Sequence, residues 1–205
     1  MPIQMNKTVK LSEIADVRPG YLGRQSALPK IDGTYHLLQL RDFNAERTAV
    51  DISSIIRFNP EPISSVQPLQ FDELIFLARG SNNFAFAPSD LPSQTIAAGY
   101  FFVIHPHAHV HPAYLAWYLN QPATLRAIAR AATSGAHMPV VRRADIENVE
   151  VLVPPQAVQR IIVELDNLMR EEQSLLHELA RKKQELISTA CMTVVQSGKQ
   201  IGDNS

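Results

Sequence analysis

The sequence has only one cysteine, Cys191, in 205 residues. A single cysteine excludes a disulfide within the chain and a zinc site built from several cysteines. No apolar run approaches the roughly 20 residues that a membrane-spanning helix needs. The first ten residues, MPIQMNKTVK, contain no apolar segment typical of a secretory signal. These features predict a cytoplasmic protein without membrane segments.

An excess of charge is also lacking. The formal net charge is -1, with a pI near 6.7. Residues 1–155 hold 13 Lys and Arg against 13 Asp and Glu, and the remainder holds 6 against 7. Bulk charge therefore gives no indication of nucleic-acid binding. A DNA-binding role would require arginines gathered on one face, or positive charge supplied by a partner protein.

The most regular stretch runs from Pro154 to about Ala190. It opens on two prolines, which are favourable at a helix start because the first-turn N–H groups have no intrahelical acceptor. No Gly or Pro follows until Gly198. At ~1.5 Å per residue this helix would be about 55 Å long, more than one small domain covers. We predict a projecting helix over residues 154–192 and a flexible tail over residues 193–205.

Apolar residues recur along this helix with heptad spacing, which is typical of a coiled coil. The residues expected to meet a partner helix are Val158, Ile161, Leu165, Leu168, Leu175, Leu179 and Leu186. A second apolar stripe beside them consists of Ile162, Met169 and Leu176. Polar residues interrupt the seam at Glu172, Lys182 and Thr189, and such positions can set register and orientation. The alternative is a long surface helix folded back on its own domain.

The segment before the long helix predicts a mixed domain. Helices are expected at residues 10–17, 114–120 and 124–132, apolar strands at 34–43, 71–80, 95–104 and 149–153, and polar loops at 59–68 and 81–90. Most strands fall in the middle, as in α+β proteins. The predicted class is therefore α+β: a strand-rich domain over residues 1–153, followed by the long coiled-coil helix.

Seven segments occur in an order that is more specific than any one of them. They are KLSEIADVRPG, HLLQLRDF, FDELIFLARGS, AAGYFFVIHP, PAYLAWYLNQP, ATSGAHMPVVRRADIENVEVLVPP and QAVQRIIVELDNL. The ordered set resembles the target-recognition domain of type I restriction-modification specificity subunits, and the resemblance extends over residues 9 to about 190. Members of that family usually carry two recognition domains and two helical regions. This chain has room for one of each, so it resembles a half-sized specificity subunit.

The resemblance implies a chain that reads DNA sequence, performs no chemistry and needs no cofactor. Its implied partners are double-stranded DNA, adenine methyltransferase subunits and, for restriction, a translocating nuclease subunit. The sequence agrees with a non-catalytic role. It has no Asn/Asp-Pro-Pro-aromatic motif for an adenine amino group and no phosphate-binding Gly-Lys-Ser/Thr loop.

A half subunit with an exposed helical seam could pair with a second copy or with another half subunit. An antiparallel two-fold pair of helices would place two recognition domains at opposite ends. We therefore expect a DNA site of two inverted half-sites, separated by a non-specific gap of about one to two duplex turns.

Base recognition requires side chains that match base edges. Arginine can donate two parallel hydrogen bonds to guanine, and Asn or Gln can do the same for adenine. The candidates in polar loops beside strands are Arg24, Gln25, Arg41, Arg79, Ser81, Asn82, Asn83, His137, Arg142 and Arg143. For each arginine the alternative is a solvated charge or an internal salt bridge, such as Arg41 with Asp42 or Arg143 with Asp145.

A run of alternating histidines offers a different chemistry. On an extended segment, His105, His107, His109 and His111 would all point the same way and could bind zinc, nickel or copper. No Cys, Asp or Glu lies within the run to complete a catalytic set. A metal-dependent enzyme is therefore one alternative to DNA recognition. The other is the DNA-recognition component of a different defence or methylation system.

Overall fold

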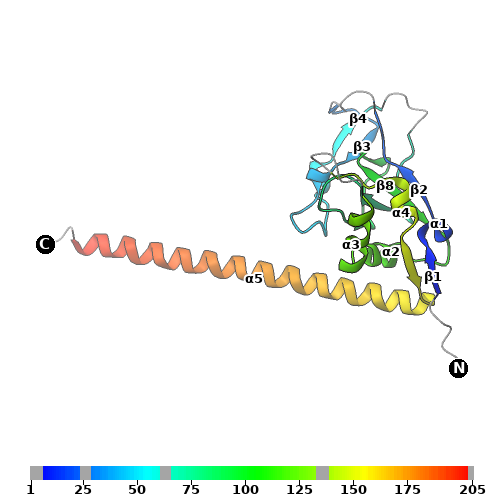
Figure 1. The fold of residues 1–205 in the computed structure, drawn as a ribbon. Coiled ribbons are helices and arrows are strands. Elements are labelled where there is room, and N and C mark those ends of the chain that lie inside the picture. Colours follow the sequence, from blue (N-terminus) through cyan, green and yellow to red (C-terminus); the bar gives the residue numbers. More distant parts are fainter. Residues whose placement is uncertain (1–6, 24–28, 61–65, 133–138, 203–205) are drawn as a thin grey trace. The chain divides into compact units, whose positions relative to one another are not determined.

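The computed structural model describes residues 7–23, 29–60, 66–132 and 139–202, with side chains of the last helix described to Gln196. The chain divides into two units, Met1–Val163 and Glu164–Ser205. The first unit is mixed α and β, and the second continues a single helix, α5 (Gln156–Gly202) (Figure 1). The predicted α+β class with a long C-terminal helix is confirmed.

Strands of the first unit form three sheets among the described residues. The four-stranded sheet has the order β2 (Ala15–Pro19), β8 (Phe101–Pro106), β5 (Leu74–Leu77) and β6 (Ala85–Phe86), and all its pairs are antiparallel. The three-stranded sheet has the order β4 (Ile56–Phe58), β3 (Tyr35–Leu38) and β7 (Thr95–Ala97). In it, β3 is antiparallel to β4 and parallel to β7. The third sheet is the antiparallel pair of β1 (Lys7–Lys10) and β9 (Glu150–Val153).

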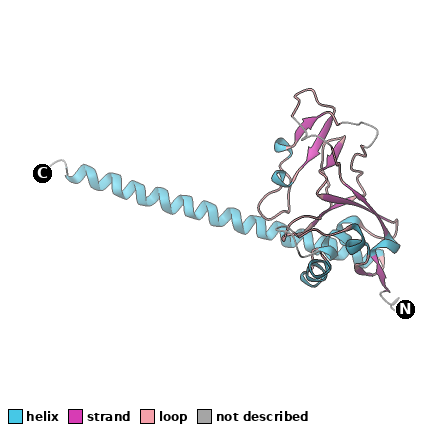
Figure 2. Ribbon diagram, turned by 45° about the horizontal axis from the view of Figure 1, so that its top comes forward, coloured by secondary structure: helices cyan, strands magenta, loops and turns pink. Residues whose placement is uncertain are grey.

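Helices of the first unit gather at one end, away from β3 and β4 (Figure 2). They are α1 (Leu11–Ile14), α2 (Pro112–Leu119), α3 (Pro122–Ala131) and α4 (Arg143–Glu147), with 3-10 turns η1 (Leu40–Asp42) and η2 (Ile52–Ser54). Both α2 and α3 begin with a proline, whose fixed φ suits the first helical position. They correspond to the helices predicted over residues 114–120 and 124–132, but each begins two residues earlier, at its proline.

Strand β5 lies between two hydrophobic cores. Leu74 and Phe76 pack in the core that includes the helices, whereas Ile75 and Leu77 pack in the core that includes the three-stranded sheet. Side chains alternate across a strand, so both faces of β5 are covered and all four residues are buried. This explains why its sequence is a continuous apolar run.

Three predicted elements are wrong in extent. The strand predicted over residues 34–43 is the shorter β3, because the chain turns into η1 after Leu38. The helix predicted over residues 10–17 is a single turn, α1, because Ala15 and Val17 alternate inward with Asp16 and Arg18 outward and form edge strand β2. The strand predicted over residues 95–104 is split into β7 and β8. Gly99 and Tyr100 separate them in a turn closed by a 2.9 Å hydrogen bond from Phe101 N to Ala98 O.

Other differences come from contacts between distant segments. The loop predicted over residues 81–90 carries strand β6 and buried Phe84, whose ring centroid lies 5.1 Å from that of Phe43. Strand β1 was not predicted because its partner β9 is far away in the sequence. Helix α4 was not predicted either, since it has only five residues.

The start of α5 belongs to the first unit, which ends at Val163 rather than at the predicted residue 153. Gln159 is fully buried there. Its amide oxygen accepts from the backbone N–H of His111 at 2.7 Å. Its amide nitrogen donates to the carbonyl oxygens of Pro154 at 2.8 Å and His109 at 3.1 Å. One side chain therefore satisfies three backbone groups and fixes the first turns of α5 against the loop that precedes α2.

Replacing this glutamine tests that assignment. Gln159→Leu should lower the free energy of unfolding of the first unit by about 2–4 kcal/mol, because it leaves three buried backbone groups without partners. The neighbouring Gln156 is exposed and makes a single hydrogen bond to Ala108 O at 2.9 Å. Gln156→Leu should therefore cost under about 1 kcal/mol. Denaturant titration of both variants measures the difference, and equal losses would refute the role given to Gln159.

Tyr114 makes the first unit sensitive to alkaline pH. Its side chain is 1% exposed and its hydroxyl donates to Leu152 O at 2.5 Å. Burial raises the pKa of Tyr114 to about 12, and nearby Tyr118 adds to the increase. The unfolded chain ionises near pH 10, so this stabilisation should be lost as the pH rises from about 10 to 12. Unfolding free energies of Tyr114→Phe and wild type should converge over that interval; parallel curves would contradict this.

The second unit continues α5 through Gly202, past the predicted helix end at residue 192. Residues 193–202 of the predicted tail are therefore helical. At ~1.5 Å per residue the 47-residue helix is about 70 Å long. No helix in the described ranges is both long and apolar enough to cross a lipid bilayer.

Candidate nucleic-acid interface

An open cavity of about 830 Å³ brings together several of the predicted DNA-binding residues. Arg41, Arg79, Ser81 and Asn82 all line it, although they come from two segments about forty positions apart. The other lining residues are Gln39, Leu40, Arg47, Leu77, Gly80 and Tyr100. We refer to this set as the arginine cavity.

Arg41 stands on the short 3-10 turn η1, directly after β3. The turn is fixed by Asp42, whose buried carboxylate accepts from Gln39 N at 2.7 Å and from Ser54 Oγ at 3.0 Å. Arg41 Nε lies 3.8 Å from the same carboxylate, and the Arg41 side chain is 60% exposed. The predicted pairing of Arg41 with Asp42 is thus present but long, and it leaves the guanidinium open to solvent.

Tyr100 holds the same turn from the other side. Its hydroxyl accepts a 2.8 Å hydrogen bond from Leu40 N. Burial raises the pKa of Tyr100, and a hydrogen bond from Leu40 opposes this in part. The phenol therefore stays neutral around pH 7 and adds no negative charge to the arginine cavity.

Arg79 follows β5 and leads into a tight turn. Val140 forms an isolated antiparallel bridge with Arg79, and Gly80 N donates to Pro139 O at 2.9 Å. Gly80 has φ +99°, a conformation that side chains rarely adopt, so glycine is required there. This geometry presents Arg79, Ser81 and Asn82 as exposed side chains at the end of a buried strand.

Arg47 was not among the predicted site residues. It lies in the turn after η1 with φ +58°, which is unusual for a residue other than glycine. Its guanidinium donates from Nη1 to Asn82 O and lies 5.1 Å from the centroid of the Phe84 ring. Arg47 therefore joins the turn that carries it to the loop that carries Ser81 and Asn82.

The lining of the arginine cavity contains three arginines and no Asp or Glu. For Arg47 and Arg79 the described residues offer no carboxylate within salt-bridge distance, and the only one near Arg41 is buried Asp42. Such a concave, positively charged surface attracts anions. It also presents guanidinium forks, an amide and a hydroxyl, the groups that recognise base edges and phosphates.

Three other predicted residues are placed elsewhere. Asn83 turns inward, where its amide nitrogen donates to Leu77 O at 2.8 Å and caps the end of β5. Arg142 pairs with Asp145 at 2.8 Å, and Arg143 pairs with Glu147 at 2.6 Å, both at α4. The predicted partner of Arg143 was Asp145, but that carboxylate pairs with Arg142 and Arg143 pairs with Glu147. Hydrogen bonds from Arg142 hold the pKa of Asp145 below its ordinary value.

The remaining predicted residues, Arg24, Gln25 and His137, lie outside the described residues. The same holds for the segment 134–136, which was expected to place backbone N–H groups near a phosphate. Their roles stay predictions. Of the residues that the sequence missed, Tyr100 had a signal in Gly99, which marks a turn inside an apolar run. Arg47 had no local signal, because Glu46 and Thr48 make its surroundings look like an ordinary solvated turn.

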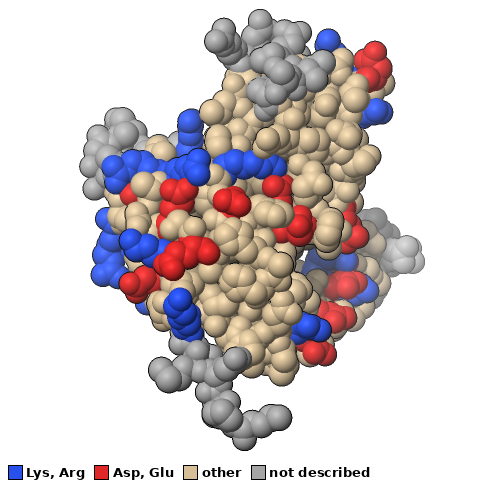
Figure 3. All heavy atoms as spheres, turned by 90° about the vertical axis from the view of Figure 1, so that its right-hand side faces the viewer, with Lys and Arg blue, Asp and Glu red and all other residues tan. Residues whose placement is uncertain are grey.

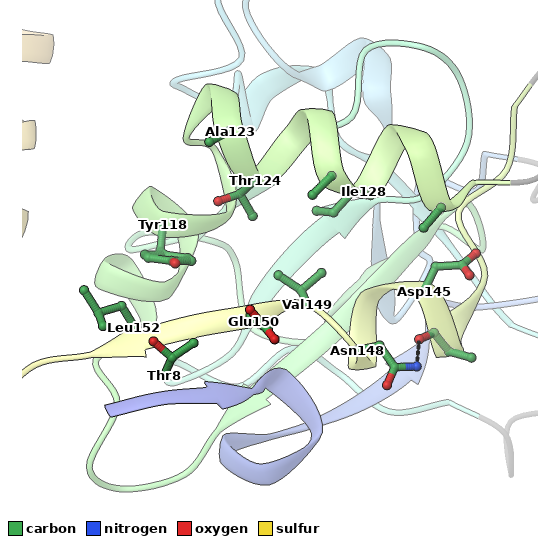
Figure 4. A pocket seen from close by; sticks show the side chains of 13 residues that line it. Thr8, Tyr118, Ala123, Thr124, Ile128, Asp145, Asn148, Val149, Glu150 and Leu152 are labelled. Carbon is green, nitrogen blue, oxygen red and sulfur yellow. Dashed lines mark hydrogen bonds between the residues drawn. The ribbon is translucent and has the colours of Figure 1, made fainter. Parts of the chain in front are cut away.

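A second cavity, of about 800 Å³, differs in character from the first. Figure 4 shows it between α3, α4 and β9, with the side chains of Ile128 and Val149 beside hydroxyl and amide groups. Its lining includes Asp145 and Glu150 but no Lys or Arg. A groove with carboxylates and no cation repels phosphates, so the arginine cavity is the better candidate for nucleic acid.

Mixed charge also characterises the face of the molecule in Figure 3, where basic and acidic side chains lie next to one another. Ion pairs of the first unit follow the same pattern, for example Arg18 with Glu73 at 2.8 Å. Paired charges cancel at a distance. The near-neutral composition is thus compatible with a local excess of arginine in one cavity.

The histidine run is not arranged as a single row of ligands. His105 is in β8 and lies 3.7 Å from Asp72, whereas His107 lies in the following turn, 3.6 Å from Asp16. His111 caps α2, with its Nδ1 accepting from Ala113 N at 3.2 Å. In the described ranges, no three His, Cys, Asp or Glu side chains are grouped closely enough to hold a metal ion.

Comparisons with known proteins support a fold assignment. No protein-family model and no curated protein sequence matches the chain. Solved structures do match. A chain from a structure of complex assembly and conformational transition in a type I R-M system aligns with a TM-score of 0.61 and 18% identity, over 88% of this chain and 42% of that one.

Two further solved structures of such subunits also match the chain. The S subunit of a type I restriction-modification system from M. genitalium aligns with a TM-score of 0.54 and 11% identity, over 83% of this chain and 40% of that subunit. The HsdS subunit from Thermoanaerobacter tengcongensis aligns with a TM-score of 0.56 and 17% identity, over 84% and 39%. The chain therefore has the fold of type I specificity subunits and spans about two fifths of their length.

Proposed function

We propose that this chain, with the fold of a type I specificity subunit, is the DNA sequence-recognition subunit of a type I-like restriction-modification system. The observation that carries the proposal is the arginine cavity. Three separately positioned guanidinium groups converge there on a surface whose lining contains no Asp or Glu. Solvated surface arginines have no reason to converge in this way.

Within the proposed function, the arginines have different tasks. Arg41 and Arg79 are exposed and stand on rigid turns at the ends of β3 and β5, so they are suited to base edges in the major groove. Arg47 is partly engaged by Asn82 O and the Phe84 ring, so it suits a phosphate contact that fixes the register on the duplex. Exposed Ser81 and Asn82 supply further hydrogen bonds.

The chain spans two fifths of the matched structures, so the proposal includes a second recognition domain from another molecule. A second copy, or a related half subunit, joined through α5 would supply it. The pair would read a site of two inverted half-sites with a gap between them. Methyltransferase subunits would dock along the helices, with a translocating nuclease subunit as a further partner in the cytoplasm.

The catalytic step belongs to the partner in this proposal. The chain would select the sequence, and the methyltransferase subunit would modify adenine. A recognition component of another defence or methylation system would bind DNA in the same way but would associate with a different enzyme.

Co-purification together with mapping of methylated adenines tests the proposal. Tagged chain should retain an adenine methyltransferase, and deleting the gene for the chain should remove adenine methylation at one defined sequence. Retention of a different enzyme would favour the other kind of system. Unchanged methylation after deletion would contradict the proposed function.

A further inference from the structure

The cavity of about 800 Å³ between α3, α4 and β9 contains one edge of a β-strand. Strand β9 pairs with β1 along its first edge, and Figure 4 shows α3 beyond its second edge. We refer to the space between α3, α4 and β9 as the edge groove. A strand edge presents backbone N–H and C=O groups that form hydrogen bonds with an extended chain beside them. An open edge therefore specifies the backbone conformation of its ligand.

The register of β1 and β9 shows which backbone groups of β9 are open. Leu11 N donates to Val149 O at 2.8 Å, so these two residues are a hydrogen-bonded pair of the antiparallel ladder. Such pairs alternate with pairs that form no hydrogen bond. Glu150 and Leu152 are therefore in the second kind of pair, and their N–H and C=O groups point away from β1.

One of these groups has a partner inside the first unit. The hydroxyl of Tyr114 donates to Leu152 O at 2.5 Å, which agrees with the orientation deduced from the register. Within the described residues, the N–H and C=O of Glu150 and the N–H of Leu152 form no hydrogen bond. Two donors and one acceptor thus remain along the side of β9 that is turned toward α3.

The other edge of this two-stranded sheet is protected against pairing. It belongs to β1, where Lys7 and Lys10 are exposed. The N–H of Lys10 already donates to Glu13 Oε1 at 3.0 Å. Exposed lysines are a common means of keeping an edge strand from pairing with another chain. Strand β9 contains no lysine, so its edge is the better of the two for accepting a strand.

The wall opposite β9 is apolar. On α3, the exposed residues Ala123, Ala127 and Ala131 line the edge groove, and their short side chains leave space beside them. Ile128 and Val149 add apolar surface between the helix and the strand (Figure 4). Side chains of an added strand that point toward α3 therefore gain stability when they are apolar.

Glu150 gives the edge groove its available charge. Its side chain is exposed and has no ion pair with any described residue. The other carboxylate of the lining, Asp145, is 7% exposed and pairs with Arg142 at 2.8 Å. Lys10, opposite Glu150 on β1, donates from Nζ to Asn148 Oδ1 at 3.0 Å. An exposed carboxylate beside an open strand edge favours a ligand that carries Lys or Arg.

We propose that the edge groove binds an extended segment of the methyltransferase subunit, which adds a third strand beside β9. The segment carries apolar side chains for the alanine-lined wall and a Lys or Arg beside Glu150. In strand addition the backbone supplies affinity and the adjoining pockets supply specificity. The four residues of β9 span about 13 Å, so a segment of about four to six residues covers the edge. The identity of the partner rests on the proposed function, and this contact is additional to docking along α5.

Filling the edge groove tests the site. Ala127→Phe places a ring in the groove and should weaken binding of the purified methyltransferase subunit to the full chain by about 10- to 100-fold. Ala129→Phe adds the same ring at an exposed position of α3 outside the groove, so it should change affinity by less than about threefold. Isothermal titration calorimetry measures both variants and wild type. Equal affinities of the two variants would overturn the inference.

Reversing the charge of Glu150 tests the side-chain preference. Glu150→Lys should weaken binding of the methyltransferase subunit by about tenfold, because a basic side chain of the added strand then meets a lysine. Asp32→Lys makes the same change at an exposed turn outside the edge groove and should leave affinity within about threefold of wild type. Wild-type affinity of Glu150→Lys would overturn the proposed basic ligand.

Hydrogen exchange separates strand addition from other contacts. When the methyltransferase subunit is added, the N–H groups of Glu150 and Leu152 should exchange at least about tenfold more slowly, because they become hydrogen-bonded. The N–H of Thr8 points away from β9 on the outer edge of β1 and is the internal control, which should not change.

The remaining outcomes of this experiment distinguish the two proposals. Slower exchange confined to α5 would overturn the edge groove as a docking site and would leave the proposed function in place. Protection of Glu150 and Leu152 in the chain alone would assign the groove to a second copy or to another segment of this chain, and would overturn the partner named here. A wild-type chain that binds no methyltransferase would contradict the proposed function itself.

Discussion

Replacing both Arg41 and Arg79 by alanine is expected to weaken binding to the preferred duplex by roughly 10²- to 10⁴-fold. In the proposed function each exposed guanidinium makes a bidentate base contact worth about 1–3 kcal/mol, and tenfold in affinity corresponds to about 1.4 kcal/mol. The two residues come from separate turns that Asp42 and Gly80 fix independently. Neither turn depends on its arginine for folding, so the double variant should keep the wild-type unfolding transition.

The control for this variant is Arg130→Ala on α3, an exposed arginine that does not line the arginine cavity. It should change affinity by less than about threefold. Binding is measured by fluorescence anisotropy with specific and scrambled duplexes at several fixed salt concentrations. Loss of affinity for both duplexes alike would assign the arginines to phosphates instead of bases. An unchanged affinity would exclude the cavity as the reading surface.

Breaking the helix pair should have the second large effect. Leu175 and Leu179 lie on the exposed apolar seam of α5, so Leu175→Glu combined with Leu179→Glu would place four carboxylates in the proposed pair of helices. The variant should be monomeric. Its affinity for a duplex with two half-sites should fall by about 10²- to 10³-fold, because the second head no longer binds at high effective concentration. Its affinity for a single half-site should be unchanged, since the first unit is intact.

Gln184→Glu adds a carboxylate on the outward side of the same helix and serves as the control for charge alone. It should remain a dimer with wild-type affinity for the double site. Mass in solution and anisotropy with single and double half-sites separate the two effects. A monomeric double-glutamate variant that still binds the double site like wild type would show that pairing contributes nothing to DNA reading.

Local pattern was sufficient for some elements of the fold. Helices α2 and α3 and the apolar strand β5 were predicted from local pattern, although both helices begin two residues before the predicted starts, at their prolines. The start of α5 after Pro154 and Pro155 is another case, although buried Gln159 assigns its first turns to the first unit.

Local sequence pattern was insufficient for elements that form through contacts with segments far away in the sequence. Strand β1 exists because it pairs with β9, at the other end of the unit. Phe84 looked like part of an exposed loop, but its ring packs against Phe43 and its backbone precedes β6. Neither contact can be predicted from the residues next to it in the sequence.

Part of the candidate site could likewise be predicted from the local sequence, and part of it could not. Arg41 and Arg79 could be identified because each follows an apolar strand, and strand ends commonly present functional side chains. The sequence could not show that both arginines line one cavity, because this depends on how β3 and β5 are arranged in different sheets. Arg142 and Arg143 had equally good local context, yet the structure pairs both with carboxylates of α4. Tertiary partners thus distinguish an available arginine from a structural one.

The central claim is that two copies of this chain act as paired DNA-reading heads. Selection of bound sequences from random duplexes by the wild-type chain, at stated salt, tests it most directly. The predicted result is a site of two inverted half-sites separated by a gap of about one to two duplex turns that carries no sequence preference. An enriched site that is asymmetric or uninterrupted, or no enrichment at all, would contradict the claim.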